Sequence, residues 1–325
     1  MSAPQSTLTP ARSFLNWPVA TDPERWCAEV ALCGIQHSEP YARDPQPNDQ
    51  ARAPEAIRLR SEQISYGPQQ WDFDLEAPLA ALVPRCIDIG NIAWQGGSYD
   101  EYAAGITARV RHLWRQGTQL FVLGGDHGVT IPVLDALDAL GERVHVVHID
   151  AHLDWREEVG GVRRGYSSPL RWASTKPAVS GMTQIGMRQT GSARQAEVRA
   201  ARDYGSHVFP AEQLHEHGWS RVLETIPRDS AVYLTIDADG LDPTEMPAVM
   251  APCPGGITYR ELAPMLRRIA REHRVVGMDV VEVAPSFDSA NGITAIMAGR
   301  LIVNVLGASW GAGGAMALPT PTAGP

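Results

Sequence analysis

Apolar and polar residues alternate along most of the chain in two periods, one typical of buried strands and one typical of helices. Several short runs consist almost entirely of Val, Ile and Leu, as expected for strands buried on both faces of a parallel sheet. Such runs lie at 30–35, 85–89, 120–123, 144–149, 183–187, 231–236 and 275–281. Because helical patterns lie between them, the sequence predicts an α/β fold: a three-layer, doubly wound, mostly parallel β-sheet flanked by helices, in a single domain.

Two of the helical patterns begin with a capping box, in which Ser or Thr is followed three residues later by Glu. Ser98 and Glu101 form the first box, and Thr258 and Glu261 form the second. Apolar residues follow each box at spacings of three and four, so that one face of each helix would cover the sheet. We therefore expect amphipathic helices to begin at these two points.

Both ends of the chain lack these periods. Residues 1–25 are polar and contain several prolines, and we expect them to form an N-terminal arm. Residues 26–310 would form the single α/β domain, and residues 311–325, rich in Gly, Ala and Pro, would form a flexible C-terminal tail. The segment 37–53 is also polar and rich in proline, and it is predicted to be a long surface loop.

Composition and charge narrow the class of protein. The chain is 44% hydrophobic and 20% charged with a net charge of -9, which is typical of a soluble globular protein. No basic face indicates a nucleic acid or an anionic membrane as a partner, and no run of about 18 apolar residues predicts a membrane span. The four cysteines show no CxxC spacing and residues 1–20 contain no apolar signal core, so a cytoplasmic location is expected.

Polar clusters follow three of the predicted strands: Gly-Gly-Asp-His at 124–127, Asp-Ala-His-Leu-Asp at 150–154 and Asp-Ala-Asp-Gly-Leu-Asp-Pro at 237–243. In open α/β sheets, binding sites form where loops leave the carboxyl ends of strands. In an extended chain, Asp150, His152 and Asp154 point to one side. Several carboxylates beside a buried strand are costly unless a cation neutralises them. The clusters therefore predict a metal site.

The donors in these clusters match two divalent ions. Four carboxylates would balance four positive charges, and donors without a thiolate favour manganese or a similar ion over structural zinc. Two ions about 3.5–4 Å apart can share a bridging water and lower its pKa. The candidate ligands are His127, Asp150, His152, Asp154, Asp237 and Asp239.

Each cluster alone has an ordinary alternative. Gly-Gly-Asp-His could be a turn with a capping Asp, the second cluster a surface acidic turn, and the third an Asp-Gly turn or a calcium-type loop. His145 and His148 alternate with valines inside a predicted strand and read as packed histidines. The chain contains no GxGxxG after the first strand, no P-loop and no GxSxG, so dinucleotide, P-loop and serine-hydrolase interpretations have no support.

The three clusters, in this order and spacing, resemble the signatures of the ureohydrolases, which include arginases, agmatinases, guanidinobutyrases and formimidoylglutamases. Three further segments resemble elements of the same family: Ala-Pro-Glu-Ala-Ile-Arg at 53–58, Asp-Ile-Gly-Asn-Ile at 88–92 and Asp-Val-Val-Glu-Val-Ala-Pro at 279–285. The resemblance covers most of the chain. It implies the arginase-like fold and a small cationic guanidino substrate.

The resemblance also implies roles for individual residues. One ion would be held by His127, Asp150, Asp154 and Asp237, and the other by Asp150, His152, Asp237 and Asp239. A hydroxide between the ions would attack the guanidinium carbon, Glu282 would hold the guanidinium, and Asp154 would carry a proton to the leaving amine. An alternative for Glu282 is a salt bridge with a nearby arginine. Manganese is the expected metal, with nickel and cobalt as alternatives, and a homo- or hetero-oligomer, trimer or hexamer, is expected.

Two substrate-side elements depart from the family pattern. The segment Tyr-Ser-Ser-Pro at 166–169 stands in place of His-Gly-Thr-Pro, and Val-Met-Ala-Pro at 249–252 stands in place of Thr-Gly-Thr-Pro. Trp155 follows the second cluster, where smaller residues are common. We predict that Trp155, Tyr166 and Ser168 contact the substrate and form an aromatic pocket that favours alkylated cations. Alternatively, these residues pack beneath the site.

The sequence thus predicts a binuclear metal hydrolase that is agmatinase- or guanidinobutyrase-like and releases urea and an amine. One alternative is a hydrolase of an N-alkylated guanidine or a biguanide. Two other classes are a low-activity partner subunit of a hetero-oligomeric ureohydrolase and an amide hydrolase of acylated amines that uses a single zinc.

Overall fold

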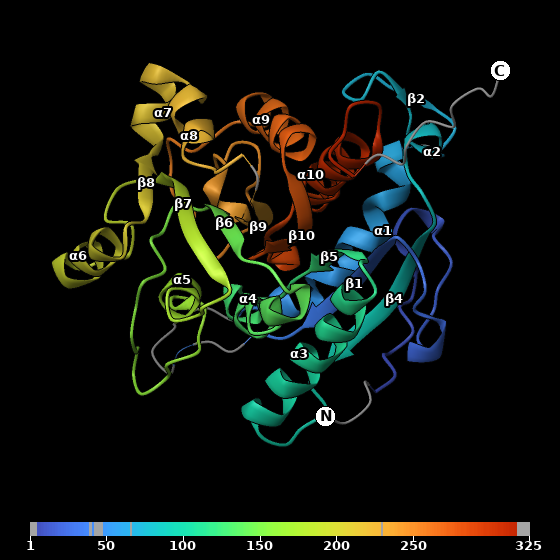
Figure 1. Ribbon diagram of the computed structural model, residues 1–325, viewed down its shortest axis with the longest axis horizontal. Coiled ribbons are helices and arrows are strands. Elements are labelled where there is room, and N and C mark those ends of the chain that lie inside the picture. Colours follow the sequence, from blue (N-terminus) through green and yellow to red (C-terminus); the bar gives the residue numbers. More distant parts are fainter. Residues whose placement is uncertain (1–4, 39–40, 42–47, 66, 229, 317–325) are drawn as a thin grey trace.

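The computed structural model describes residues 5–38, 41, 48–65, 67–228 and 230–316. Its centre is an eight-stranded sheet in the order β4-β1-β5-β10-β9-β6-β7-β8, in which every neighbouring pair is parallel (Figure 1). The strands of this sheet are β1 (Val30–Gln36), β4 (Cys86–Ala93), β5 (Gln119–Leu123), β6 (Val144–Ile149), β7 (Val179–Met187), β8 (His207–Pro210), β9 (Ala231–Asp237) and β10 (Arg274–Val281). All seven predicted strands are confirmed.

Helices cover both faces of the sheet, as predicted for a doubly wound fold. The α-helices are α1 (Ala53–Ser65), α2 (Leu79–Leu82), α3 (Tyr99–Arg115), α4 (Thr130–Leu134), α5 (Pro169–Ala173), α6 (Gln195–Tyr204), α7 (Ala211–His217), α8 (Ser220–Glu224), α9 (Tyr259–Glu272) and α10 (Ile293–Trp310). Both predicted capping boxes are present at the starts of α3 and α9. A short hairpin of β2 (Trp71–Asp72) and β3 (Ala77–Pro78) lies outside the main sheet.

The core has two halves because successive residues of each strand point to opposite faces. On β5, Phe121 and Leu123 belong to the half that α1, α9 and α10 cover, whereas Leu120 and Val122 belong to the half that α3 and α4 cover. Figure 1 shows these two groups of helices on opposite sides of the sheet. Burial on both faces explains why the strands are apolar without alternation.

Helix α10 is mostly apolar and has no continuous polar face, unlike the amphipathic helices. It is long and apolar enough to cross a membrane by length and composition, yet 72% of it is buried inside the protein. It packs against α1 and α9. Because the protein covers most of its surface, the helix needs no polar face, and its sequence therefore shows no amphipathic pattern.

Residues 5–25 lie along the outer edge of the sheet, next to β4. Leu8 pairs with Asn91, the backbone N–H of Phe14 donates to Asp88, and Phe14 is fully buried. The division into an arm (1–25), a domain (26–310) and a tail (311–325) stays a prediction, and residues 317–325 of that tail lie outside the described residues. So do residues 39–40 and 42–47 of the predicted loop 37–53.

A buried ion pair joins α1 to β4 and thus joins two of the family-like segments. Nε and Nη2 of Arg58 donate to the two carboxylate oxygens of Asp88 at 2.8 and 2.9 Å, and Nη1 donates to Asn91 at 2.5 Å. Neither Arg58 nor Asp88 is exposed. Their positions give the segments 53–58 and 88–92 a structural role rather than a catalytic one.

Replacing Arg58 with Met is expected to lower the free energy of unfolding by about 3–5 kcal/mol, because it leaves the Asp88 carboxylate buried without its partner. Urea denaturation would measure the loss. The matched control is Arg12→Met, which removes the exposed ion pair with Glu62 and should cost no more than about 1 kcal/mol. Equal losses in the two variants would contradict this account of Arg58.

Candidate active site

Four neighbouring strands bring the predicted site residues to one edge of the sheet. Strands β5, β10, β9 and β6 lie side by side in this order and run parallel, so their carboxyl ends meet. His127 begins a turn of 3₁₀ helix shortly after β5, Asp150 directly follows β6, and Asp237 ends β9. Glu282 directly follows β10. Residues distant in the sequence therefore converge, as the strand-end argument predicted.

The Nδ1 atom of His127 faces three carboxylates. It lies 3.0 Å from Asp154 Oδ2 and 3.3 Å from both Asp150 Oδ2 and Asp237 Oδ2. This nitrogen is buried and makes no hydrogen bond of acceptable geometry with any of these oxygens. Because buried polar atoms are normally hydrogen-bonded, an unbonded nitrogen among carboxylate oxygens fits a position for a cation.

A second group of donors lies beside the first. Nδ1 of His152 lies 3.1 Å from Asp239 Oδ2 and 3.3 Å from Asp150 Oδ1. Asp150 turns its other oxygen toward His127, so its two oxygens face the two groups. Ligand atoms of His127, Asp150 and Asp154 lie within 4.8 Å of one another, and so do those of Asp150, His152 and Asp239. A carboxylate shared in this way fits two adjacent ions better than one.

Burial makes this set of carboxylates electrostatically unfavourable without a cation. Burial, together with the charges of Asp239 and Asp150, raises the pKa of Asp237 well above its ordinary value. Burial and the charge of Asp150 also raise the pKa values of Asp154 and Asp239. Divalent cations would stabilise the ionised forms. The nitrogen and oxygen donors therefore fit a binuclear divalent centre.

Hydrogen bonds behind His127 fix its ring. The hydroxyl of Thr235 donates to Asp279 Oδ1 at 2.6 Å and lies 2.9 Å from Nε2 of His127. Because the Thr235 proton is used for Asp279, Nε2 of His127 donates to Thr235 and leaves the lone pair on Nδ1 facing the carboxylates. Our sequence reasoning missed Thr235, although its place two residues before Asp237 on a strand puts it on the same side.

Asp154 and Glu282, the two candidate catalytic residues, have left-handed backbone conformations with φ of +55° and +64°. This region costs a non-glycine residue roughly 1–2 kcal/mol, and such residues cluster at functional sites. The carbonyl of Asp154 accepts hydrogen bonds from Leu170 and Arg171. The N–H of Glu282 donates to the carbonyl of Gly125 at 2.8 Å. These bonds hold both residues in the strained conformation.

Comparison with known proteins establishes the family. The profile of the arginase family matches residues 28–307. The chain belongs to the arginase family. It is 34% identical to an N(1)-aminopropylagmatine ureohydrolase of Thermus thermophilus over 72% of this chain and 76% of that protein. It is 28% identical to an agmatinase of Sodalis glossinidius over 93% of this chain and 94% of that protein.

Among solved structures, proclavaminate amidino hydrolase from Streptomyces clavuligerus is similar, with a TM-score of 0.74 and 27% identity over 91% of this chain and 96% of that chain. These relationships confirm the resemblance, the arginase-like fold and the enzyme class. As a member of the arginase family, the chain is a hydrolase of C–N bonds in guanidino compounds, which are linear amidines, and the family uses a binuclear divalent metal centre.

In this member of the arginase family, Glu282 lines the smaller cavity and is paired with no arginine among the described residues. Its Oε1 accepts the backbone N–H of His127 at 2.7 Å, and its Oε2 accepts the amide of Gln50 at 2.9 Å. No described residue forms an ion pair with it. Burial, and next the charge of Asp126, raise the pKa of Glu282 to about 8. A guanidinium placed here would favour the ionised form.

Gln50 is a site residue that sequence reasoning missed. It lies in the polar segment 37–53, which we interpreted as a surface loop, yet it is buried in a short turn of 3₁₀ helix before α1. No periodicity or motif marks it, because a single glutamine among polar residues carries no such signal.

A cavity of about 350 Å³ opens onto the donor cluster. Its floor contains His152, Asp154, Asp237, Asp239 and Glu282. The other lining residues are neutral: Asn48, Gln50, Tyr166, Ser167, Ser192, Met250 and Ala251. The structure therefore brings Tyr166 to the cavity, together with Met250 and Ala251 of the second departing segment.

Trp155 and Ser168 do not line this cavity, and their contact with the substrate stays a prediction. The indole of Trp155 is buried, donates to Gln184 at 2.6 Å and packs beside Tyr204. Ser168 is buried at the start of α5, and its neighbour Ser167 lines the cavity instead. Their burial fits the alternative interpretation, in which both residues pack beneath the site.

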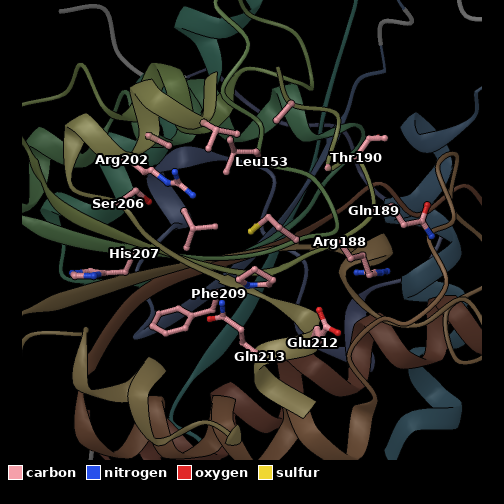
Figure 2. Close-up of a pocket in the computed structure, with 17 residues that line it drawn as sticks. Leu153, Arg188, Gln189, Thr190, Arg202, Ser206, His207, Phe209, Glu212 and Gln213 are labelled. Carbon is pink, nitrogen blue, oxygen red and sulfur yellow. The ribbon is translucent and has the colours of Figure 1, made fainter. Parts of the chain in front are cut away.

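A larger cavity of about 710 Å³ lies elsewhere, along β7, α6 and β8 (Figure 2). Leu153, Arg202, Ser206 and Phe209 are among its lining residues. None of the six candidate metal ligands lines it. Size alone therefore does not identify the active site, and the smaller cavity carries the donors and Glu282.

Proposed function

We propose that the chain hydrolyses a guanidino compound that has no carboxylate head group and releases urea and an amine. The observation that carries this proposal is the wall of the smaller cavity. Glu282 and the donor cluster occupy its floor, and no described lining residue is Lys or Arg. A substrate carboxylate would thus meet no cationic side chain among the described lining residues, and the charge of Glu282 would repel it. Agmatine and N-alkylguanidines fit this description, whereas arginine and guanidinobutyrate do not.

The proposed roles follow from the positions of the side chains. His127, Asp150, Asp154 and Asp237 would hold one divalent ion, and Asp150, His152, Asp237 and Asp239 the other, with manganese preferred over nickel or cobalt. When bound, the ions would supply a water of lowered pKa as the nucleophile. Glu282 would orient the guanidinium through charge-assisted hydrogen bonds. Asp154, in the cavity floor, would carry a proton to the leaving amine.

An N-alkylated guanidine or a biguanide is a second candidate substrate. The aromatic ring of Tyr166, which lines the smaller cavity, favours such a compound. The ring of Tyr166 lies 4.2 Å from the ring of Tyr41, centroid to centroid. Met250 and Ala251 also line the cavity. The alkyl group of the substrate would bury apolar area against these side chains. Its cationic end would be stabilised by a cation–π contact with the face of the Tyr166 ring.

Replacing Tyr166 with Ala is expected to raise KM for N-alkylguanidines about tenfold, roughly 1.4 kcal/mol, because the aromatic and apolar contact is lost. Tyr166→Phe is the control and should keep KM within about twofold, because it retains the ring. Steady-state kinetics on both variants would measure this. Equal KM values for Tyr166→Ala and wild type would show that the ring does not contact the substrate.

A substrate panel combined with metal analysis tests the proposed function. Agmatine, arginine, guanidinobutyrate, butylguanidine, dimethylguanidine and a biguanide would each be incubated with the manganese-loaded protein, and released urea and amine would be quantified. We expect turnover of agmatine or of the alkylated compounds and at least a hundredfold lower kcat/KM for arginine. Efficient arginine hydrolysis would contradict the proposal. Two bound metals with no turnover of any compound would favour the partner-subunit alternative.

We further propose that the chain acts in the cytoplasm as a trimer or hexamer. The proposed cytoplasmic location rests on the sequence features described above. The proposed trimer or hexamer rests on the resemblance to ureohydrolases. Light scattering coupled to size-exclusion chromatography would measure the assembly, and a monomeric mass at micromolar concentration would contradict it.

A further inference from the structure

A chain of buried hydrogen bonds runs from Trp155 to the carboxylate of Asp150. The indole Nε1 of Trp155 donates to Oε1 of Gln184 at 2.6 Å, and Nε2 of Gln184 lies 3.1 Å from Nδ1 of His148. Nε2 of His148 lies 2.8 Å from Asp150 Oδ2. His148 and Gln184 are direct partners on the paired strands β6 and β7, and all four residues are buried.

The partners of Gln184 fix the orientation of its amide. The indole N–H of Trp155 can only donate, so the amide atom that it contacts must be the oxygen. The backbone carbonyl of Leu153 can only accept, and it lies 2.9 Å from the other amide atom, which must be the nitrogen. Ser206 Oγ also donates to the amide oxygen, at 2.9 Å. An amide turned the other way would oppose the contacts with Trp155 and Leu153.

The amide orientation decides which nitrogen of His148 carries the proton. The amide nitrogen of Gln184 donates to Nδ1, so Nδ1 must accept and the proton of the neutral ring lies on Nε2. From there it donates to Asp150. We propose that Trp155 and Gln184 are positioning residues that hold His148 as the Nε2–H tautomer, so that His148 orients Asp150 and is not itself a metal ligand. This inference rests on the proposed binuclear centre, in which both ions share Asp150.

Distance alone would not exclude His148 as a ligand, because its donor atoms lie within the same group as those of His127, Asp150 and Asp154. The hydrogen bonds decide the matter. Nε2 uses its proton for Asp150, and the lone pair of Nδ1 accepts from Gln184, so neither nitrogen is available to an ion. A histidine or amide that orients a ligating carboxylate typically changes metal affinity without binding the metal.

The outer end of the chain of hydrogen bonds reaches the larger cavity. Ser206 and Leu153, the other two partners of Gln184, both line that cavity (Figure 2). The positioning residues therefore lie between the larger cavity and the metal cluster. This explains why Trp155, next to a ligand in the sequence, has a role in the site without facing the substrate.

Nitrogen-15 NMR of the metal-free protein, labelled in histidine, tests the tautomer. We expect the His148 ring, assigned by the signal lost in His148→Gln, to carry its proton on Nε2. In Gln184→Glu a carboxylate faces Nδ1, and we expect a proton to appear there. Titration with Mn²⁺ tests the consequence: Gln184→Leu should weaken Mn²⁺ binding about 10–100-fold. Trp155→Phe, which removes the indole N–H together with part of the buried ring, should weaken it less.

Gln119 provides a matched control. It is as buried as Gln184, its amide oxygen accepts the indole N–H of Trp310 at 2.8 Å, and its nitrogen donates to the carbonyl of Val275 at 2.8 Å. It lies at the start of β5, at the opposite edge of the sheet from the site. Gln119→Leu and Trp310→Phe should therefore lower Tm as much as the Gln184 and Trp155 variants while leaving Mn²⁺ affinity and the His148 tautomer unchanged.

His148→Gln separates a positioning role from a ligand role, because glutamine keeps an N–H donor for Asp150. We expect two bound Mn²⁺ per chain in this variant and fewer in His148→Leu. Loss of one Mn²⁺ in His148→Gln, an Nδ1–H tautomer in the wild type, or unchanged Mn²⁺ affinity in Gln184→Leu would overturn the inference. A wild-type chain that binds no Mn²⁺ would instead contradict the proposed function, since the tautomer is measured without metal.

Discussion

Asp150→Asn is expected to abolish turnover, with a loss in kcat/KM on the order of 10³-fold or more, and to reduce the bound metal from two divalent ions per chain to one or fewer. The reason is the position of Asp150, whose two oxygens face the two histidines His127 and His152. Asparagine offers one neutral oxygen and one NH₂ group, so it can bind a metal on one side but not on both. A loss of about 4 kcal/mol of transition-state stabilisation corresponds to a 10³-fold slower reaction.

The control for this prediction is Asp242→Asn, a change in the same sequence cluster as Asp237. The carboxylate of Asp242 accepts from Thr244, Gly255 and Gly256 and shapes a turn outside the cavity. This variant should keep both metals and most of the activity, with some loss of Tm. Metal content by mass spectrometry and kcat/KM on the best substrate would be measured for both variants. Two metals and wild-type turnover in Asp150→Asn would rule out the shared-carboxylate centre.

The fold was predictable where burial leaves a periodic signal. Val, Ile and Leu are frequent in the strands that are buried on both faces. Two helices begin with capping boxes that are recognisable in the sequence. Edge strand β8, with the sequence His-Val-Phe-Pro, was missed because it is short and only partly buried. Helix α10 was missed for the opposite reason, since burial on nearly all sides removes the polar face that would show its period.

The candidate site was predictable because its residues follow the carboxyl ends of parallel strands, which meet at one edge of the sheet. The extended conformation expected for residues 150–154 is absent, since residues 151 and 152 form a bend and Asp154 is left-handed, yet the side chains converge. Side chains outside the three motifs gave no such signal. Gln50 reaches Glu282 from a polar stretch without a motif. Trp155 was assigned to the substrate because of its place beside a ligand, but its ring points to Gln184 instead.

Glu282 is the residue that we propose to bind the guanidinium, and its surroundings support that role. Its carboxylate is buried in the cavity floor, and two neutral N–H groups, from His127 and Gln50, are its hydrogen-bond partners. Neutral donors leave its negative charge uncompensated, which is why burial raises its pKa to about 8. The left-handed backbone at Glu282 aims the side chain into the cavity at an energetic cost. A cationic substrate would supply the missing positive charge.

Glu282→Gln is therefore expected to lower kcat/KM for guanidino substrates by about 10²–10³-fold, roughly 3–4 kcal/mol, because truncating one partner of a buried charge pair costs several kcal/mol. The change is isosteric, so the N–H of His127 can still donate to the new side chain and the metal content should stay at wild-type level. The positive charge persists through the reaction, so both KM and kcat should be affected. Gln50→Leu, which removes only a neutral donor to Glu282, serves as the comparison and should cost about tenfold or less. If Glu282→Gln turned over guanidines within about fivefold of wild type, Glu282 would be a structural acceptor for His127, and the guanidinium would have to be bound by another group.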